Sequence, residues 1–181
     1  MQKYYEDWKK TNGAQRILRA RVLDPEGILK GNGYVEGVYE FSYYNVKSGM
    51  ELSSYIGQAG DNPTAPDYVA SDVYERILQH LKRWMGGNYY TYWTGLEDDD
   101  NSDWKIKIKL LCEENNHSRR LELESMYIKK KKPLLQDTQD GRYKLYPTKY
   151  GYKRNDLCIS PWDDQRKKAF EDRVAEIEKA S

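Results

Sequence analysis

Arg76 and His80 stand four residues apart in a segment that predicts a helix, and both can bind a charged group. Residues at this spacing lie on one helix face, about one turn apart. A guanidinium and an imidazole presented together can bind one phosphate through several hydrogen bonds. For such a pair taken alone, a solvated helix face is the more common explanation.

Glu124 falls inside an apolar stripe of a later predicted helix. At 3.6 residues per turn it lies between Leu121 and Ile128, beside Tyr127, whereas Glu122 points away. A carboxylate held against apolar surface is costly unless it is paired or binds a cation. Glu124 is therefore a candidate cation ligand. The alternative is a position at the edge of the stripe, with the carboxylate in water or on a lysine.

Tyr39 and Tyr55 fall on two neighbouring predicted strands. Tyrosine is common on half-buried sheet surfaces, so composition alone makes both ordinary sheet residues. Their significance depends on what the fold places beside them.

The elements that position these residues follow from hydrophobic periodicity and turn residues. Residues 35–43 and 51–57 predict two strands of a hairpin, joined by a turn at 47–49. A helix should begin near Asp72, whose carboxylate can cap it, and should end at the glycine pair 86–87.

The rest of the chain predicts further strands and helices. In residues 105–112, isoleucines alternate with lysines 105, 107 and 109, which predicts a strand with a solvated lysine face. The other expected elements are a short helix and loop in 1–33, a strand at 89–94 that pairs with 105–112, an acidic loop at 97–103, a helix at 117–131 stopped by Pro133, an irregular segment at 137–161 and a charged amphipathic helix at 161–179.

Taken together, the chemistry-bearing positions resemble the GIY-YIG nuclease family in order and spacing. Residues 37–39 (Gly-Val-Tyr) look like the first signature, with Val38 for Ile, and residues 55–57 (Tyr-Ile-Gly) match the second. Arg76 and His80 resemble the family's Arg-x3-His. Residues 123–133 resemble its helix with a metal-binding Glu, an Ile four residues later and a Pro nine residues later.

The sequence departs from the family pattern at two places. Residues 58–71 form an insertion between the hairpin and the helix. Gln136 stands where the family often has Asn, twelve residues after Glu124, so the role of that position is open. His80 favours the restriction-endonuclease-like branch.

The resemblance implies an α+β fold, a small antiparallel sheet flanked by helices with extensions at both ends. It covers residues 34–136, between an N-terminal extension (1–33) and a C-terminal extension (137–181) that holds a basic, aromatic loop and a helix. It also implies catalytic roles for Tyr39, Tyr55, Arg76, His80 and Glu124, with structural support from Gly37, Gly57 and Gln136.

The implied chemistry is hydrolysis of phosphodiester bonds. Tyr39 would act as the base toward water, assisted by His80 because a neutral phenol with a pKa of about 10 is a poor base. Arg76 would bind the non-bridging oxygens and Tyr55 would donate to the same phosphate. Glu124 would hold one Mg²⁺ or Mn²⁺.

Two basic segments are candidates for DNA contact. The first is the lysine run 129–132 at the end of the Glu124 helix, where a solvated helix end is an equally good explanation. The second, residues 141–154, contains five basic residues and four tyrosines. The candidate DNA-binding residues are Lys129, Lys130, Lys131, Lys132, Arg142, Lys144, Lys149, Lys153 and Arg154.

Composition sets looser bounds. The net charge of +1 gives no global positive field, and mean hydropathy is −1.00. Cys112 and Cys158 lack metal-ligand spacing, which argues against structural zinc or a disulfide framework. The charged start does not resemble a signal peptide, and no apolar run is long enough to span a membrane, so we expect a cytoplasmic protein.

The sequence thus predicts a metal-dependent endonuclease of double-stranded DNA, most similar to a type II restriction enzyme. A homodimer would be the simplest way to cut both strands. The alternatives are a phage or mobile-element nuclease of loose specificity and a catalytically silent nucleic-acid-binding module.

Overall fold

The computed structural model describes residues 7–31, 33–63, 71–85, 103–133 and 164–180. Within them the elements, in chain order, are α2 (Asn12–Arg21), β1 (Val22–Leu23), the 3-10 helix η1 (Ile28–Lys30), β2 (Gly37–Asn45), β3 (Glu51–Ala59), α3 (Val73–Met85), β4 (Trp104–Glu113), α5 (His117–Lys131) and α6 (Asp164–Ala180).

The described strands form one sheet in the order β1-β4-β2-β3. β2 pairs antiparallel with both β3 and β4, and β1 pairs parallel with β4. The sheet is therefore mixed, and the expectation of a purely antiparallel sheet was wrong. β1 has two residues, too few to show an alternating pattern, and the sequence analysis assigned it to a helix and loop.

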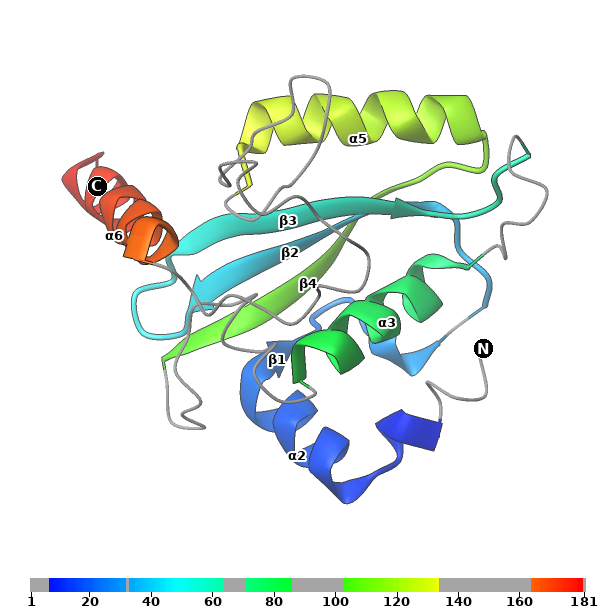
Figure 1. The fold of residues 1–181 in the computed structure, drawn as a ribbon, viewed down its shortest axis with the longest axis horizontal. Coiled ribbons are helices and arrows are strands. Elements are labelled where there is room, and N and C mark those ends of the chain that lie inside the picture. Colours follow the sequence, from blue (N-terminus) through cyan, green and yellow to red (C-terminus); the bar gives the residue numbers. More distant parts are fainter. Residues whose placement is uncertain (1–6, 32, 64–70, 86–102, 134–163, 181) are drawn as a thin grey trace.

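Helices cover both faces of this sheet (Figure 1). On one face, Ile77 and Leu81 of α3 belong to the same buried apolar cluster as Phe41 and Ile108 of the sheet. On the other face, α5 contributes a smaller cluster around its Ile128. The sheet is thus the middle layer between α3 and α5.

The hairpin and the first core helix agree with the sequence analysis. At the turn, the Oδ1 of Asn45 accepts from the backbone N–H groups of Lys47 and Ser48, both at 3.0 Å. At the start of α3, the Oδ1 of Asp72 accepts from the backbone N–H of Glu75 at 2.7 Å, so the predicted cap is confirmed. The expected end of this helix at 86–87 lies outside the described residues.

The metal-ligand helix of the sequence analysis is α5, with the bounds expected for it. Asn116 caps its start by accepting from the backbone N–H of Arg119 at 3.0 Å. Lys132 ends it in the left-handed conformation, with φ 48°, one residue before Pro133. Pro133, which cannot continue a helix, explains why the end of α5 could be predicted.

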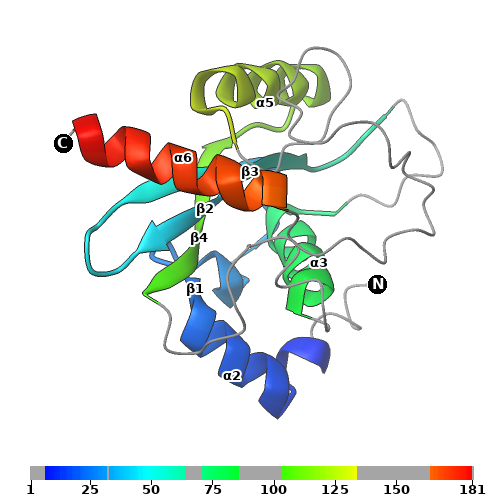
Figure 2. The ribbon, with the colours of Figure 1, turned by 60° about the vertical axis from the view of Figure 1, so that its left-hand side comes forward.

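The C-terminal helix α6 packs on the same domain. Val174 and Ile177 lie against the main apolar cluster, and α6 runs beside the turn end of the β2–β3 hairpin (Figure 2). The expected strand at 89–94, most of the acidic loop and the irregular segment at 137–161 lie outside the described residues. None of the described helices is long and apolar enough to cross a membrane.

Candidate active site

Tyr39 lies in the middle of the sheet and is fully buried. Its partner across the β2–β3 pair is Gly57. A Cβ added at Gly57 would lie 2.6 Å from the Tyr39 hydroxyl oxygen and 2.9 Å from the Cε1 of Tyr55. The missing side chain of Gly57 therefore makes the space that the Tyr39 hydroxyl occupies, which gives a physical reason for glycine at this position.

Substituting Gly57 with alanine should destabilise the protein by about 1–3 kcal/mol, because an added methyl in a filled space forces the two tyrosine rings apart. Gly13→Ala is the matched control, since a Cβ there meets nothing within 4 Å. Urea unfolding followed by circular dichroism measures both. Equal stability of Gly57→Ala and wild type would contradict the tight packing described here.

His80 and Arg76 approach the Tyr39 hydroxyl from α3. The Nε2 of His80 lies 2.9 Å from that oxygen, within hydrogen-bond distance. Arg76 also forms a hydrogen bond with Tyr39, and its Nη1 donates to the Oε1 of Gln79 at 3.0 Å. The expectation that Arg76 and His80 share one helix face is confirmed, and both act on one phenol.

Tyr55 completes the aromatic side of this group. Its ring centroid lies 5.1 Å from that of His80 and 6.4 Å from that of Tyr39. The second signature tyrosine and the Arg-x3-His pair are therefore neighbours of the first signature tyrosine in space, although 41 positions separate Tyr39 from His80.

The environment keeps Tyr39 in its neutral form. Burial, followed by the neighbouring Tyr55, raises the pKa of Tyr39 well above its ordinary value of 10.0. The Arg76 guanidinium lowers this pKa and the Glu124 carboxylate raises it, and the net shift is upward. Tyr39 therefore carries its proton at neutral pH, and it can accept another only if it passes its own to a neighbour.

Glu124 is almost fully buried on the sheet-facing side of α5. The buried stripe of this helix is Arg120, Glu124 and Ile128, whereas Leu121 is 39% exposed. The expected stripe from Leu121 to Ile128 was wrong at its first residue. Arg120 takes the inner position because it finds hydrogen-bond acceptors there, and Leu121, one residue further round the helix, faces solvent.

The charge of Glu124 raises the Tyr39 pKa, so the two groups interact although α5 and α3 cover opposite faces of the sheet. β3, which carries Gly57, is the edge strand of the described sheet. The Tyr39 hydroxyl thus forms hydrogen bonds with His80 and Arg76 of α3, and it lies within the electrostatic influence of the Glu124 carboxylate on α5.

Gly37 permits a close approach of β2 to β4. A Cβ there would lie 2.2 Å from the carbonyl oxygen of Cys112. The β2–β4 register shifts between Val38 and Tyr39, where Leu111 of β4 is the extra residue. Such a bulge changes the direction of the neighbouring side chains and is common next to functional sites. Gly37 therefore allows the backbones of β2 and β4 to approach closely two residues before Tyr39, and Gly57 leaves room for the Tyr39 hydroxyl.

Arg120 is a residue of this region that the sequence analysis missed. It is fully buried one turn before Glu124. Its guanidinium donates to the carboxylate of Glu36 at 2.5 Å, to the Gln58 side chain at 3.1 Å and to the backbone carbonyl of Asp61.

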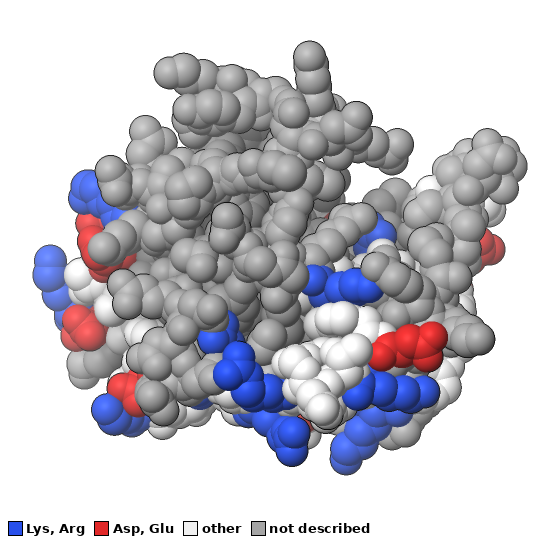
Figure 3. Space-filling view, turned by 60° about the horizontal axis from the view of Figure 1, so that its bottom comes forward, with Lys and Arg blue, Asp and Glu red and all other residues white. Residues whose placement is uncertain are grey.

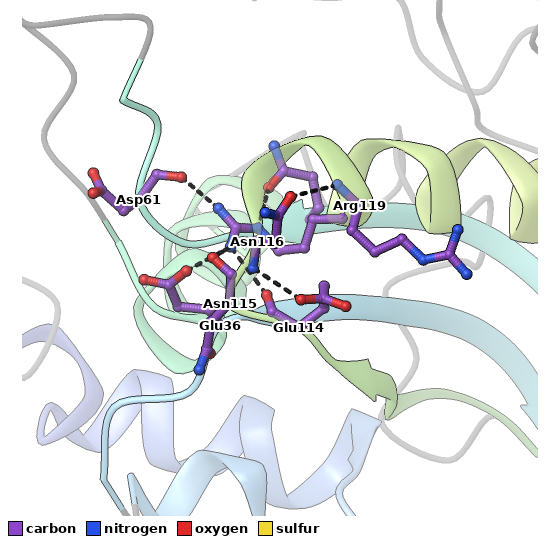
Figure 4. A network of polar contacts seen from close by, with 8 residues as sticks. Glu36, Asp61, Glu114, Asn115, Asn116 and Arg119 are labelled. Carbon is purple, nitrogen blue, oxygen red and sulfur yellow. Dashed lines mark hydrogen bonds and ion pairs between the residues drawn. The ribbon is translucent and has the colours of Figure 1, made fainter.

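The same guanidinium also donates to the carbonyls of Glu114 and Asn115, both at 3.0 Å (Figure 4). It thereby joins the start of α5 to the segment before β2 and to the end of β3. The spacing of four between Arg120 and Glu124 was the available signal, because it places the arginine on the inner face of the helix.

The single candidate carboxylate suits a Mg²⁺ ion bound mainly by water and phosphate better than a metal ion bound by several protein side chains. Among the described residues no group of three His, Cys, Asp or Glu side chains could hold a metal ion. Mg²⁺ is commonly bound through one or two carboxylates, with water and substrate phosphates as the other ligands. A single carboxylate at Glu124, whose charge acts on the Tyr39 hydroxyl, is compatible with that chemistry. Of the acidic loop, Asp103 pairs with Lys47 at 2.8 Å, at the hairpin turn.

The candidate DNA-binding residues divide into two sets. Lys129 to Lys132 end α5, and Lys131 forms an ion pair with the buried Glu40 at 2.6 Å. The other set, Arg142, Lys144, Lys149, Lys153 and Arg154, lies outside the described residues, as does Gln136. Seen from the α2 side of the molecule, the coloured surface mixes basic, acidic and neutral side chains (Figure 3).

The lysine face of β4 was expected to be solvated, and this was wrong for two of its residues. Lys107 and Lys109 pair with Glu51 of β3 at 3.0 and 2.5 Å, and both are largely covered. The reason is that Glu51 of β3 provides a carboxylate across the sheet, which holds both lysine side chains against the sheet surface.

No family model, curated protein or solved structure matches this chain.

Proposed function

We propose that this protein is a metal-dependent nuclease of the GIY-YIG type that hydrolyses phosphodiester bonds in duplex DNA. The observation that supports this most is the environment of the Tyr39 hydroxyl, which interacts with His80 and Arg76 of α3 and with the charge of Glu124 on α5. These are the positions through which the sequence resembles that family.

Arg76 and Tyr55 are the proposed phosphate-binding groups. Arg76 is a permanent cation with several donors, and it can stabilise the negative charge that develops on the non-bridging oxygens during hydrolysis. Its hydrogen bond to Gln79 helps to fix its orientation. The Tyr55 hydroxyl is a single neutral donor that can bind the same phosphate.

Tyr39 and His80 form the proposed proton path. A proton removed from the attacking water passes to the Tyr39 oxygen while the Tyr39 proton passes to the Nε2 of His80, 2.9 Å away. This coupled transfer avoids a free phenolate, which the raised pKa of Tyr39 makes unfavourable. His80 must therefore start as the tautomer with an unprotonated Nε2.

Glu124 is the proposed ligand of one Mg²⁺ or Mn²⁺, which would supply positive charge beside the phosphate and stabilise the leaving oxygen. The carboxylate is almost fully buried and its charge acts on the Tyr39 hydroxyl, so a bound cation would offset the cost of burying that charge.

Replacing Tyr39 with phenylalanine should lower plasmid nicking in Mg²⁺ by about 10²–10⁴-fold, the range that positioned proton transfer contributes. Tyr44→Phe is the matched control, because Tyr44 lies on the same strand. The substitution keeps the aromatic ring, whose centroid lies 4.6 Å from the Nζ of Lys107. Supercoiled plasmid conversion is followed on agarose gels. Similar loss in both variants would show that Tyr39 has no special role.

A catalytically silent nucleic-acid-binding module is the second candidate. The full burial of Tyr39 favours it, because cleavage requires a rearrangement that admits water and a phosphate to the hydroxyl. Wild-type protein that retains duplex DNA but does not nick it in Mg²⁺, Mn²⁺ or Co²⁺ would decide for this candidate.

The finer assignment we propose is a restriction-like enzyme that acts as a homodimer, since two chains supply one site for each strand. Sequencing the ends of fragments from a known plasmid tests it. A single recurrent end sequence supports restriction-type specificity, and scattered ends support a nuclease of loose specificity.

A further inference from the structure

A cavity of about 330 Å³ lies between the β2–β3 hairpin, the C-terminal end of α5 and α6. Its cationic lining comes from three elements, with Lys109 on β4, residues 130–132 on α5 and Arg173 on α6. Two carboxylates, Glu40 and Glu51, also line it. Side chains distant in sequence thus gather around one space.

Both carboxylates already have partners. Glu40, 1% exposed, pairs with Lys131 at 2.6 Å, and Glu51 pairs with Lys109 at 2.5 Å. Burial raises the pKa of Glu51, but hydrogen bonds from Lys109 and other donors outweigh it and bring the pKa to about 2. Glu51 is therefore ionised at neutral pH. These pairs leave the lining with an excess of positive charge.

That excess comes from Lys130, Lys132 and Arg173. Within the described part of the chain, Lys130 and Lys132 have no carboxylate partner, and Arg173 pairs with Glu176 on the exposed side of its own helix. Ser53 also lines the cavity, and its buried hydroxyl has no hydrogen-bond partner among the described residues. Three cations and a hydroxyl donor around one cavity are the groups that bind a phosphate.

The cavity lies along α5 from the candidate active site. Lys131 follows Glu124 by seven residues on the sheet-facing side of α5, which at 1.5 Å per residue is about 10 Å along the axis. The cavity and the candidate active site are therefore about two helical turns apart along α5.

We propose that this cavity binds a backbone phosphate of the DNA, close to the position of cleavage. The proposal rests on the proposed nuclease function for its substrate. It adds Ser53 and Arg173 to the DNA-contacting residues and gives α6 a direct part in binding. The bound phosphate would fix where the duplex lies relative to Glu124.

The test measures binding of a fluorescently labelled random-sequence duplex by anisotropy, in EDTA and over a series of KCl concentrations. Lys130→Ala and Arg173→Ala should each weaken binding by about threefold to tenfold and reduce the slope of log affinity against log salt by about one. Lys168→Ala and Lys179→Ala remove the same charge from exposed positions of α6 outside the cavity. These controls should stay within about twofold of wild type.

Ser53→Ala distinguishes a specific phosphate site from non-specific electrostatic attraction, because it removes a hydrogen-bond donor without changing charge. It should weaken binding by about threefold, whereas Ser118→Ala, at an exposed site on α5, should not. Equal losses in cavity and control lysine variants, or no loss in Ser53→Ala, would overturn the proposal.

Plasmid nicking by the wild type in Mg²⁺ is measured beside these binding curves. If only the cavity variants lose DNA affinity and the wild type does not nick plasmid, the phosphate site stands and the nuclease proposal is refuted. If the wild type nicks plasmid but cavity and control variants lose DNA affinity equally, the nuclease proposal stands and the phosphate site is refuted.

Discussion

Replacing Glu124 with alanine should reduce plasmid nicking by more than about 10³-fold, a loss of over 4 kcal/mol of transition-state stabilisation. Glu124 is the proposed metal ligand, and the described residues contain no group of three metal-binding side chains that could take over its role. The loss should persist at high Mg²⁺, because the alanine methyl group cannot coordinate the ion.

DNA retention should survive the same substitution. Removing a negative charge beside the proposed phosphate site does not weaken the attraction to a polyanion, so the anisotropy curve of Glu124→Ala should match that of wild type or shift to tighter binding. The pair of measurements, nicking lost and binding kept, separates a catalytic ligand from a residue that holds the fold.

Glu122→Ala is the matched control for this experiment. Glu122 lies two residues away on α5, is exposed and pairs with Arg119 at 2.7 Å. Its substitution should leave nicking within about twofold. If Glu124→Ala nicked DNA as fast as Glu122→Ala, the assignment of Glu124 as metal ligand would be wrong.

Replacing Arg120 with methionine should destabilise the protein by about 3–5 kcal/mol. The change leaves the nearly buried Glu36 carboxylate without its cation, and three backbone carbonyls and the Gln58 amide without their donor. Breaking a buried ion pair by removing one partner is among the most costly single substitutions. Urea unfolding at pH 7 measures the effect as a fall in midpoint.

The neighbouring arginine gives the control. Arg119 is exposed and pairs with Glu122, so Arg119→Met should change stability by less than about 0.5 kcal/mol. In the double variant Arg120→Met, Glu36→Gln the neutral amide should recover part of the loss, because no unpaired charge then stays buried. A loss below 1 kcal/mol for Arg120→Met would show that the network contributes little.

Much of the framework around the candidate site could be predicted from sequence. The end of α5 followed from Pro133, the start of α3 from the Asp72 cap, and the hairpin from alternation around a turn. These signals are local, because the residues that produce them lie within a few positions of one another. The five candidate catalytic positions were found through resemblance to a family motif.

What the sequence could not give depends on partners that are distant along the chain. Arg120 is buried because acceptors from three other segments reach it, and nothing near it in sequence indicates them. β2 is buried along both faces, so Glu40 lies under α5 instead of in water, which a two-sided alternation does not predict. The cavity beside α6 also depends on distant residues, because β2, β3, β4, α5 and α6 all contribute to its lining.

The short strand β1 has a consequence for self-association. Its two residues pair with Ile106 and Lys107 of β4, on the side of β4 that is not occupied by β2. Unpaired backbone groups at a sheet border are templates for intermolecular strand pairing. A fragment beginning at residue 34 would lack β1 and expose part of that border, so expression of residues 34–136 alone should favour aggregation, and a minimal domain should include residues 12–30.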